Sequence, residues 1–417
     1  MGRPSSHCAA RGSDIGPSGH CVARGFDIGS SSHCVARGFD IGPSSHCVAP
    51  ALASLAAAAC LALLAMAASH DRAAAQSYWV YAAAESEDEV ALLRYDAGGD
   101  LVVEKTITTG WLRAEIEAPH GLAMDPAGEY WYLTLGHGFP NGRLVKYATG
   151  ADTVAGVADL GLFPATIAVP PHGAVALTVN ANFHGDHVPS TVTIVDLETM
   201  FPIADVVTCT MPHGSRFNAD GTKHYSACMM DNQLVEIDGA TLDVTRRLDL
   251  IANKPATAPM EGHMAMAPPG GENCSPTWTT PHPDGRRVFV PCNKGDVILE
   301  VDLEQWRVTR RIEAPGAPYN LDLTPDGTKL LATLKGSAKV GIWDVETGVL
   351  LHLIDSLMRV THGVIVTPDG RYAIVTVEGI GGDPGTVEVI EIDSGTRVAS
   401  AQIGKQAGGI ALWKMEG

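Results

Sequence analysis

The chain has 417 residues, of which 47 are acidic and 29 are basic, which gives a net charge of −18 at pH 7. A surface this acidic repels phosphate backbones and anionic lipid headgroups, so the composition argues against nucleic-acid binding and against attachment to an anionic membrane. The length allows one large domain or two.

The first 49 residues repeat with a period of thirteen. The copies read SSHCAARGSDIGP, SGHCVARGFDIGS and SSHCVARGFDIGP, followed by a truncated SSHCVA. Each copy has too few apolar residues to form a buried face, so we expect residues 1–49 to be disordered. The His-Cys pairs offer metal ligands. The interpretation that we favour is translated repetitive DNA upstream of the true start.

An apolar run, ALASLAAAACLALLAMAA, occupies residues 51–68, and Ala73 and Ala75 precede Gln76. A hydrophobic segment followed by an A-x-A pattern is typical of a secretory signal, so we interpret residues 50–75 as a signal peptide. A retained anchor is the alternative, because about 18 apolar residues are just enough to span a bilayer. We therefore expect mature protein to be periplasmic or secreted, with no membrane attachment after cleavage.

Residues 76–417 are expected to form one β-domain. A PDG turn or a variant of it recurs, as in HPDGRRVFVPC, TPDGTKLLATL and TPDGRYAIVTV, and further short apolar strands follow each copy. Four antiparallel strands in each repeat of about 40–50 residues are typical of a propeller blade. Six complete blades are predicted to begin near His120, Ala165, His213, Cys274, Tyr319 and Thr361.

The seventh blade is split between the two ends of the domain. The first repeat, from SYWVYAAAES onward, has three strands but no innermost strand, and the C-terminal AGGIALWKM is a strand without a repeat. The predicted fold is therefore an all-β, seven-bladed β-propeller of four-stranded antiparallel blades, with the C-terminal strand completing the first blade. Closure of the ring would protect the sheet edges.

The units YNLDLTPDGTKLLATLKGSAKVGIWDVETG and HGVIVTPDGRYAIVTVEG resemble the YVTN-repeat β-propellers. The resemblance covers roughly residues 77–415. It implies an exported propeller that shares its fold with the propeller of nitrous-oxide reductase and the haem-d1 propeller of nitrite reductase. It says little about activity, because propellers support many functions.

Three histidines share one register. His120, His213 and His362 each lie eight residues before a turn glycine and open an innermost strand, so we expect them at one mouth of the central channel. The loops after the second strands should lie on the same face. The alternative is that the PHG pattern spread by duplication and only caps loops. The further candidates on this face are His137, His184, His187, Met229, and His263 and Met264 of the insert MEGHMAM.

Imidazole suits copper, zinc, nickel and iron, and thioether sulfur selects Cu(I). The histidine- and methionine-rich mouth therefore predicts a transition-metal site, with copper ahead of zinc. Cys228 and Cys292 occupy equivalent positions in neighbouring blades, and Cys274 lies between those blades. Any two of these cysteines could form a disulfide. Equally, Cys228 could be a thiolate ligand next to Met229.

The leading functional hypothesis is a metal-binding propeller that acts as a redox enzyme or as a metal carrier. The second is a metal-free hydrolase of the lactonase kind, in which the rim histidines and a carboxylate such as Glu261 or Glu378 perform acid/base chemistry on a small substrate. The third is a scaffold that binds a protein partner through its acidic rim.

Overall fold

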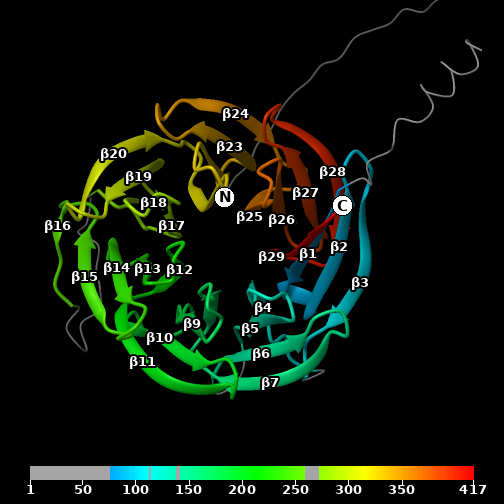
Figure 1. Cartoon of the computed structure of the whole chain (residues 1–417), viewed down its shortest axis with the longest axis horizontal. Helices are drawn as coiled ribbons and strands as arrows, with labels where there is room; N and C mark the ends of the chain where they lie inside the picture. Colours follow the sequence, from blue (N-terminus) through cyan, green and yellow to red (C-terminus); the bar gives the residue numbers. More distant parts are fainter. Residues whose placement is uncertain (1–75, 112–113, 138–140, 259–271) are drawn as a thin grey trace, which may run out of the picture. The chain divides into compact units, whose positions relative to one another are not determined.

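The computed structural model describes residues 76–111, 114–137, 141–258 and 272–417. Seven antiparallel sheets form a ring, with one strand of each sheet at the centre and the last strand at the perimeter (Figure 1). The predicted all-β seven-bladed propeller is confirmed. Within these described ranges, no helix is long and apolar enough to cross a bilayer.

The blades are numbered in chain order, and their strands are given from the channel outward. Blade 1 contains β29 (Ala407–Glu416), β1 (Ser77–Ala84), β2 (Glu89–Asp96) and β3 (Leu101–Thr108), with a 3-10 helix, η1 (Glu85–Glu87), after β1. Blade 2 contains β4 (Pro119–Met124), β5 (Tyr130–Leu135), β6 (Arg143–Ala148) and β7 (Thr153–Asp159). Blade 3 contains β8 (Pro164–Ala168), β9 (Val175–Asn180), β10 (Pro189–Asp196) and β11 (Phe201–Thr210).

Blade 4 contains β12 (Pro212–Phe217), β13 (Lys223–Cys228), β14 (Gln233–Asp238), β15 (Val244–Asp249) and β16 (Lys254–Pro255). Blade 5 contains β17 (Thr280–Pro281), β18 (Arg287–Cys292), β19 (Val297–Asp302) and β20 (Arg307–Glu313). Blade 6 contains β21 (Pro318–Leu323), β22 (Lys329–Leu334), β23 (Lys339–Asp344) and β24 (Leu350–Asp355). Blade 7 contains β25 (Val360–Val366), β26 (Tyr372–Glu378), β27 (Gly385–Glu391) and β28 (Thr396–Ile403).

Strand exchange closes the ring in the predicted way. β29 pairs with β1 in an antiparallel register that runs from Ser77 opposite Glu416 to Ala84 opposite Ala407. The Tyr78 ring of β1 also packs edge-on against Tyr372 of blade 7, with 5.4 Å between centroids. The C-terminal strand therefore completes the first blade by hydrogen bonds to β1, and the first blade packs against the last through Tyr78.

The position of a strand in its blade decides its burial pattern. The second strands are almost wholly buried, as in β22, because a neighbouring blade covers each face of the sheet. The outermost strands alternate, as β28 does from Thr396 to Ile403, because they lie at the perimeter. The apolar runs after each turn and the alternating runs that close each repeat follow from this geometry.

Two blades depart from the regular pattern of the others. The innermost strand of blade 5 has only two residues, and a single bridge between Pro276 and Cys292 precedes it. Pro276 is the counterpart of Pro119 in β4 and of Pro212 in β12, so this bridge keeps the register of the other innermost strands. In blade 4, β16 adds a fifth strand that covers part of the outer edge of β15.

The structure pairs all four cysteines of the propeller. Cys209 at the end of blade 3 is bonded to Cys228 in blade 4, with 5.9 Å between Cα atoms. Cys274 is bonded to Cys292, with 4.3 Å between Cα atoms. The first bond links adjacent blades, and the second links the entry of blade 5 to its second strand.

Candidate functional site

The three histidines that share a sequence register occupy equivalent positions on innermost strands. His120 lies in β4, His213 in β12 and His362 in β25, and all three side chains are buried. The imidazole centroid of His120 lies 5.6 Å from that of His362 and 6.4 Å from that of His213. The structure therefore brings these three residues together around the channel, as the shared register predicted. We call them the histidine ring.

The glycine that follows each ring histidine has a packing role. A Cβ atom at Gly121 would lie 2.7 Å from the carbonyl oxygen of Ala165, and one at Gly363 would lie 2.8 Å from that of Gly408. Neighbouring innermost strands are thus too close for a side chain here. The close packing of the innermost strands therefore explains the glycine of the repeated His-Gly pair. It does not explain the histidine that precedes this glycine.

Backbone carbonyls fix the tautomer of two ring histidines. Nδ1 of His120 lies 2.8 Å from the carbonyl oxygen of Ala165, and Nδ1 of His213 lies 2.7 Å from that of Thr277. A carbonyl can only accept, so both Nδ1 atoms carry the proton and each Nε2 is an acceptor. The Nε2 of His213 accepts a hydrogen bond of 3.1 Å from the hydroxyl of Tyr319. The Nδ1 bond of His120 is typical of metal-binding histidines, in which a second partner orients the ring, whereas both ring nitrogens of His213 are already hydrogen-bonded.

Burial keeps the ring histidines neutral. It lowers the pKa of His120 to about 4 and that of His213 to about 3. The pKa of His362 is also well below its usual value, because of burial and then the positive charge of Lys335. Neutral imidazole is the form that binds a metal ion or accepts a proton.

A cavity of about 380 Å³ lies at the end of the channel where the innermost strands begin, and we call it the mouth pocket. Its wall contains Glu85, Ser86, Ile116, Ala118, His120, His137, Phe163, Phe183, His184, Tyr319, Lys335, His362, Glu378 and Gln406. It therefore combines two ring histidines with side chains from the loops that follow the second strands.

Two exposed histidines of the mouth pocket face each other. Nε2 of His137, after β5, lies 3.2 Å from Nε2 of His184, after β9. The Phe163 ring packs against both imidazoles, with 5.3 Å between centroids in each case. Partial desolvation at the pocket lowers the pKa of His137. Residues 47 positions apart in the chain are thus brought into direct contact.

Two carboxylates and one lysine give the mouth pocket its charge. The Nζ atom of Lys335 lies 3.2 Å from Oε1 of Glu378, and Nε2 of His362 lies 3.8 Å from the same oxygen. Burial raises the pKa of Glu378, although Lys335 opposes this shift. Burial lowers the pKa of Lys335, but the Tyr319 hydroxyl and Glu378 outweigh burial and the net shift is upward. The Lys335 ammonium group also lies 4.3 Å from the centre of the Tyr319 ring.

Glu85 is a poised acid at the same site. Burial raises its pKa to about 7, and electrostatic interactions with His137, Lys335 and His184 limit the rise. Near neutral pH this carboxyl group therefore exchanges a proton easily.

The other predicted site residues lie elsewhere or in segments outside the described residues. His187 is exposed and Met229 is half-buried, and neither belongs to the described wall of the mouth pocket. The thiolate-ligand alternative for Cys228 is wrong, because its sulfur is bonded to Cys209 and carries no free thiolate. His263, Met264 and Glu261 lie outside the described residues.

The sequence interpretation missed Glu85 and gave Tyr319 no role. The signal was available in the blade register. The amide nitrogens of Glu85 and Lys335 donate to the carbonyl oxygens of Gln406 and Ala317, which immediately precede two innermost strands. Glu85 is thus the blade 1 counterpart of Lys335. Tyr319 follows the first proline of β21, as His120 follows that of β4.

No family model matches the chain, and no curated protein sequence matches it at a significant level. Among solved structures, the chain is similar to one of Kuenenia stuttgartiensis hydrazine synthase, with a TM-score of 0.53 and 18% identity. The match covers 69% of this chain and 80% of that chain. At this identity the likeness concerns the fold alone. Membership of the YVTN family stays a prediction.

Proposed function

We propose that this propeller binds a transition-metal ion, copper ahead of zinc, at the mouth pocket, and acts as a redox enzyme or as a metal carrier. The observation that carries the proposal is the contact between Nε2 of His137 and Nε2 of His184 at 3.2 Å, beside a ring of neutral imidazoles. Metal–imidazole bonds of about 2.0–2.1 Å place two nitrogens on one ion roughly 3.0–3.4 Å apart. The pair has this separation.

The described side chains provide only part of a metal coordination shell. In the portion of the chain that the structure describes, no group of three His, Cys, Asp or Glu side chains is positioned to hold one. His137 and His184 would occupy two positions, and a third donor requires a side-chain movement or a residue beyond the described ranges. The preference for copper rests on Met264, because thioether sulfur selects the softer ion. The bound ion would supply Lewis-acid or electron-transfer chemistry.

Export fits the same proposal. We propose that the mature protein begins near Gln76 and is periplasmic or secreted. Two disulfide bonds in one propeller support this location, because disulfides persist in oxidising compartments. The YVTN resemblance implies the same. N-terminal sequencing of the exported protein tests it, and retention of residues 5–49 would contradict it.

Metal titration of chelator-treated protein by calorimetry tests the binding site. We expect wild type to bind Cu(I) or Zn²⁺ stoichiometrically, and the H137A/H184A double variant to lose most of that affinity. The matched control is His352→Ala, because His352 lies on the perimeter strand β24 and bonds to the carbonyl oxygen of Asp393. Equal metal binding by wild type and the double variant would contradict the proposal.

The histidine ring is tested separately. If it belongs to the same site, alanine substitution of His120, His213 and His362 together should also reduce binding, and metal should no longer raise the melting temperature. An unchanged metal content would mean that the shared register is a property of the repeat alone.

A metal-free acid/base reaction is the second candidate, and the poised Glu85 favours it. Glu378 and the neutral imidazoles border the same cavity as Glu85, so a small ester or lactone could meet a proton donor and a base there. Hydrolysis of a lactone panel by chelator-treated protein would support this function, provided that Glu85→Gln abolishes it. Activity that depends on added metal would assign the pocket to the first function.

A further inference from the structure

Three charged side chains of the mouth pocket occupy one position of the repeat in neighbouring blades. They are Glu85 of blade 1, Lys335 of blade 6 and Glu378 of blade 7, and all three line the cavity. Equivalent positions of adjacent blades converge on the channel, so two carboxylates and one ammonium group meet on one side of the mouth. In each case the preceding residue pairs with the residue before the histidine-ring position: Ala84 with Ala407, Leu334 with Pro318, and Val377 with Thr361.

Lys335 already has a carboxylate partner. Its Nζ atom lies 3.2 Å from Oε1 of Glu378 and 4.3 Å from the centre of the Tyr319 ring. A carboxylate and an aromatic face are groups that bind an ammonium ion in proteins. The mouth pocket therefore already holds one primary ammonium group, that of its own lysine.

Glu85 has no partner of this kind. The residue is 7% exposed, and no described residue hydrogen-bonds to its carboxyl oxygens or forms an ion pair with them. These oxygens are not sealed inside the protein, because the fully enclosed and unpaired polar atoms of the described residues all belong to other side chains. They are therefore accessible from the mouth pocket, which Glu85 lines. A buried carboxylate without a partner is unfavourable, so it calls for a ligand that donates to it.

The charges of the mouth pocket leave one carboxylate uncompensated. Burial raises the pKa of Glu378 and the negative charge of Glu85 adds to this shift, so the two carboxylates lie near enough to interact. Lys335 neutralises only one of them. The missing partner is therefore a cation. A metal ion held at Glu85 would need further ligands around it, and the described side chains form no such group.

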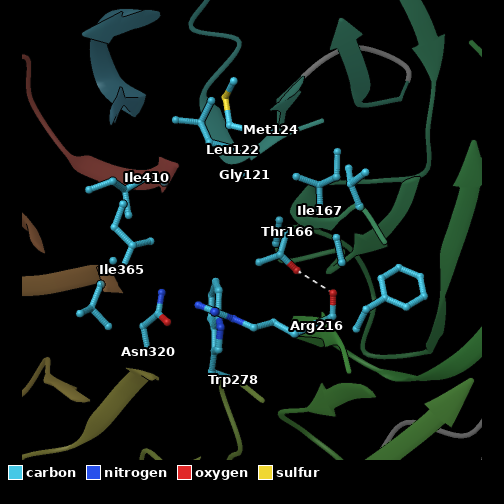
Figure 2. Close-up of a pocket in the computed structure, with 18 of the residues that line it drawn as sticks. Gly121, Leu122, Met124, Thr166, Ile167, Arg216, Trp278, Asn320, Ile365 and Ile410 are labelled. Carbon is cyan, nitrogen blue, oxygen red and sulfur yellow. Dashed lines mark hydrogen bonds between the residues drawn. The ribbon is translucent and has the colours of Figure 1, made fainter. Parts of the chain in front are cut away.

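The cavity on the other side of the histidine ring offers no comparable charge. It has a volume of about 500 Å³, and we call it the channel pocket. Aliphatic side chains such as Leu122, Ile365 and Ile410 border it in Figure 2. The Arg216 side chain in the same view donates to Oδ1 of Asp322 at 2.8 Å, so its charge is already paired. The uncompensated charge is thus at the mouth.

We propose that the mouth pocket binds a small primary amine as its ammonium ion, with the N–H groups directed at the Glu85 carboxylate. The apolar body of the amine packs against Ile116 and Phe183, which belong to the same wall. A cavity of about 380 Å³ with apolar walls and one placed charge is typical of a small-molecule site. This inference goes beyond the proposed function, because it requires neither a bound metal nor hydrolysis.

The test titrates chelator-treated protein with benzylamine and hexylamine by calorimetry and ligand-observed NMR. Benzyl alcohol and hexanol are the neutral probes with the same bodies. At about pH 8 the amines are protonated and the Glu85 carboxyl is mainly ionised. We expect at least one amine to bind wild type with Kd on the order of 1 mM or tighter. The matching alcohol should bind at least about tenfold more weakly, because it makes no charge-assisted hydrogen bond.

Glu85→Gln keeps the shape of the side chain and removes its charge, so it should weaken amine binding by about tenfold or more. The matched control is Glu87→Gln in the same 3-10 helix, because Glu87 is paired with Lys405 at 3.0 Å and does not border the described mouth pocket. This control should bind amine as wild type does. Because the Glu85 carboxyl has no partner, Glu85→Gln should keep or raise the melting temperature, which separates a ligand role from a structural role.

Metal titration of Glu85→Gln separates this inference from the proposed function. The variant should still bind metal, because that proposal rests on His137 and His184. Amine binding to metal-free protein and metal binding can therefore fail independently. The amine proposal is overturned if no amine binds at this level, if Glu85→Gln binds amine as tightly as wild type, or if the alcohol binds equally well.

Discussion

The protonation of His224 provides a quantitative test of how burial in this propeller lowers the pKa of an imidazole. The side chain is fully buried in β13, both of its nitrogens lack a hydrogen-bond partner among the described residues, and burial lowers its pKa to about 3. The unfolded chain takes up a proton below about pH 6.5, whereas the folded protein does not. The neutral form therefore contributes stability above pH 6.5, and this contribution is lost as the pH falls toward 3.

The magnitude follows from these two pKa values. Between pH 7 and pH 5, proton uptake by the unfolded state at His224 alone should lower the free energy of unfolding by about 2 kcal/mol. In His224→Leu this group no longer titrates. The loss of stability between the two pH values should therefore be about 2 kcal/mol smaller in the variant than in wild type.

Urea denaturation at pH 7 and pH 5 measures this difference. The matched control is Phe217→Leu, because the Phe217 ring packs on His224 with 5.1 Å between centroids but carries no titrating group. Relative to wild type, Phe217→Leu should be destabilised by a similar free energy at pH 7 and at pH 5. If His224→Leu and wild type lose the same free energy between pH 7 and pH 5, the argument from burial is wrong.

Three further predictions concern closure, cross-linking and the mouth pocket. Deletion of residues 408–417 removes most of the innermost strand of blade 1 and should cause aggregation or a much lower melting temperature; an unchanged melting curve would refute strand exchange as the closure. Substitution of both Cys209 and Cys228 by alanine opens a short loop and should cost about 3 kcal/mol of stability in chemical denaturation, and a cost near zero would contradict this estimate. The Glu85 carboxyl should titrate near pH 7 by infrared difference spectroscopy, with a band that is missing in Glu85→Gln; titration only below pH 5 would contradict its burial.

The sequence by itself determined the fold. Turn glycines such as Gly327 and Gly370 adopt positive φ of 72°, and the apolar run that follows each of them is a strand buried between blades. The first repeat lacks an innermost strand, and the C-terminus supplies a strand that belongs to no repeat. The sequence therefore also predicted that the C-terminal strand closes the ring in blade 1. The shared register also placed the histidine ring, because equivalent residues of equivalent strands must converge on a central axis.

Only the tertiary structure decided the rest of the site. The contact between His137 and His184 depends on two loops from different blades, and loop conformation does not follow the repeat. Cys228 pairs with Cys209 because the outer strand of one blade ends beside the second strand of the next, a contact that no sequence spacing encodes. The pKa of Glu85 likewise depends on burial by side chains distant in sequence. Periodicity fixes which residues share a position, whereas lateral packing between blades fixes which of them meet.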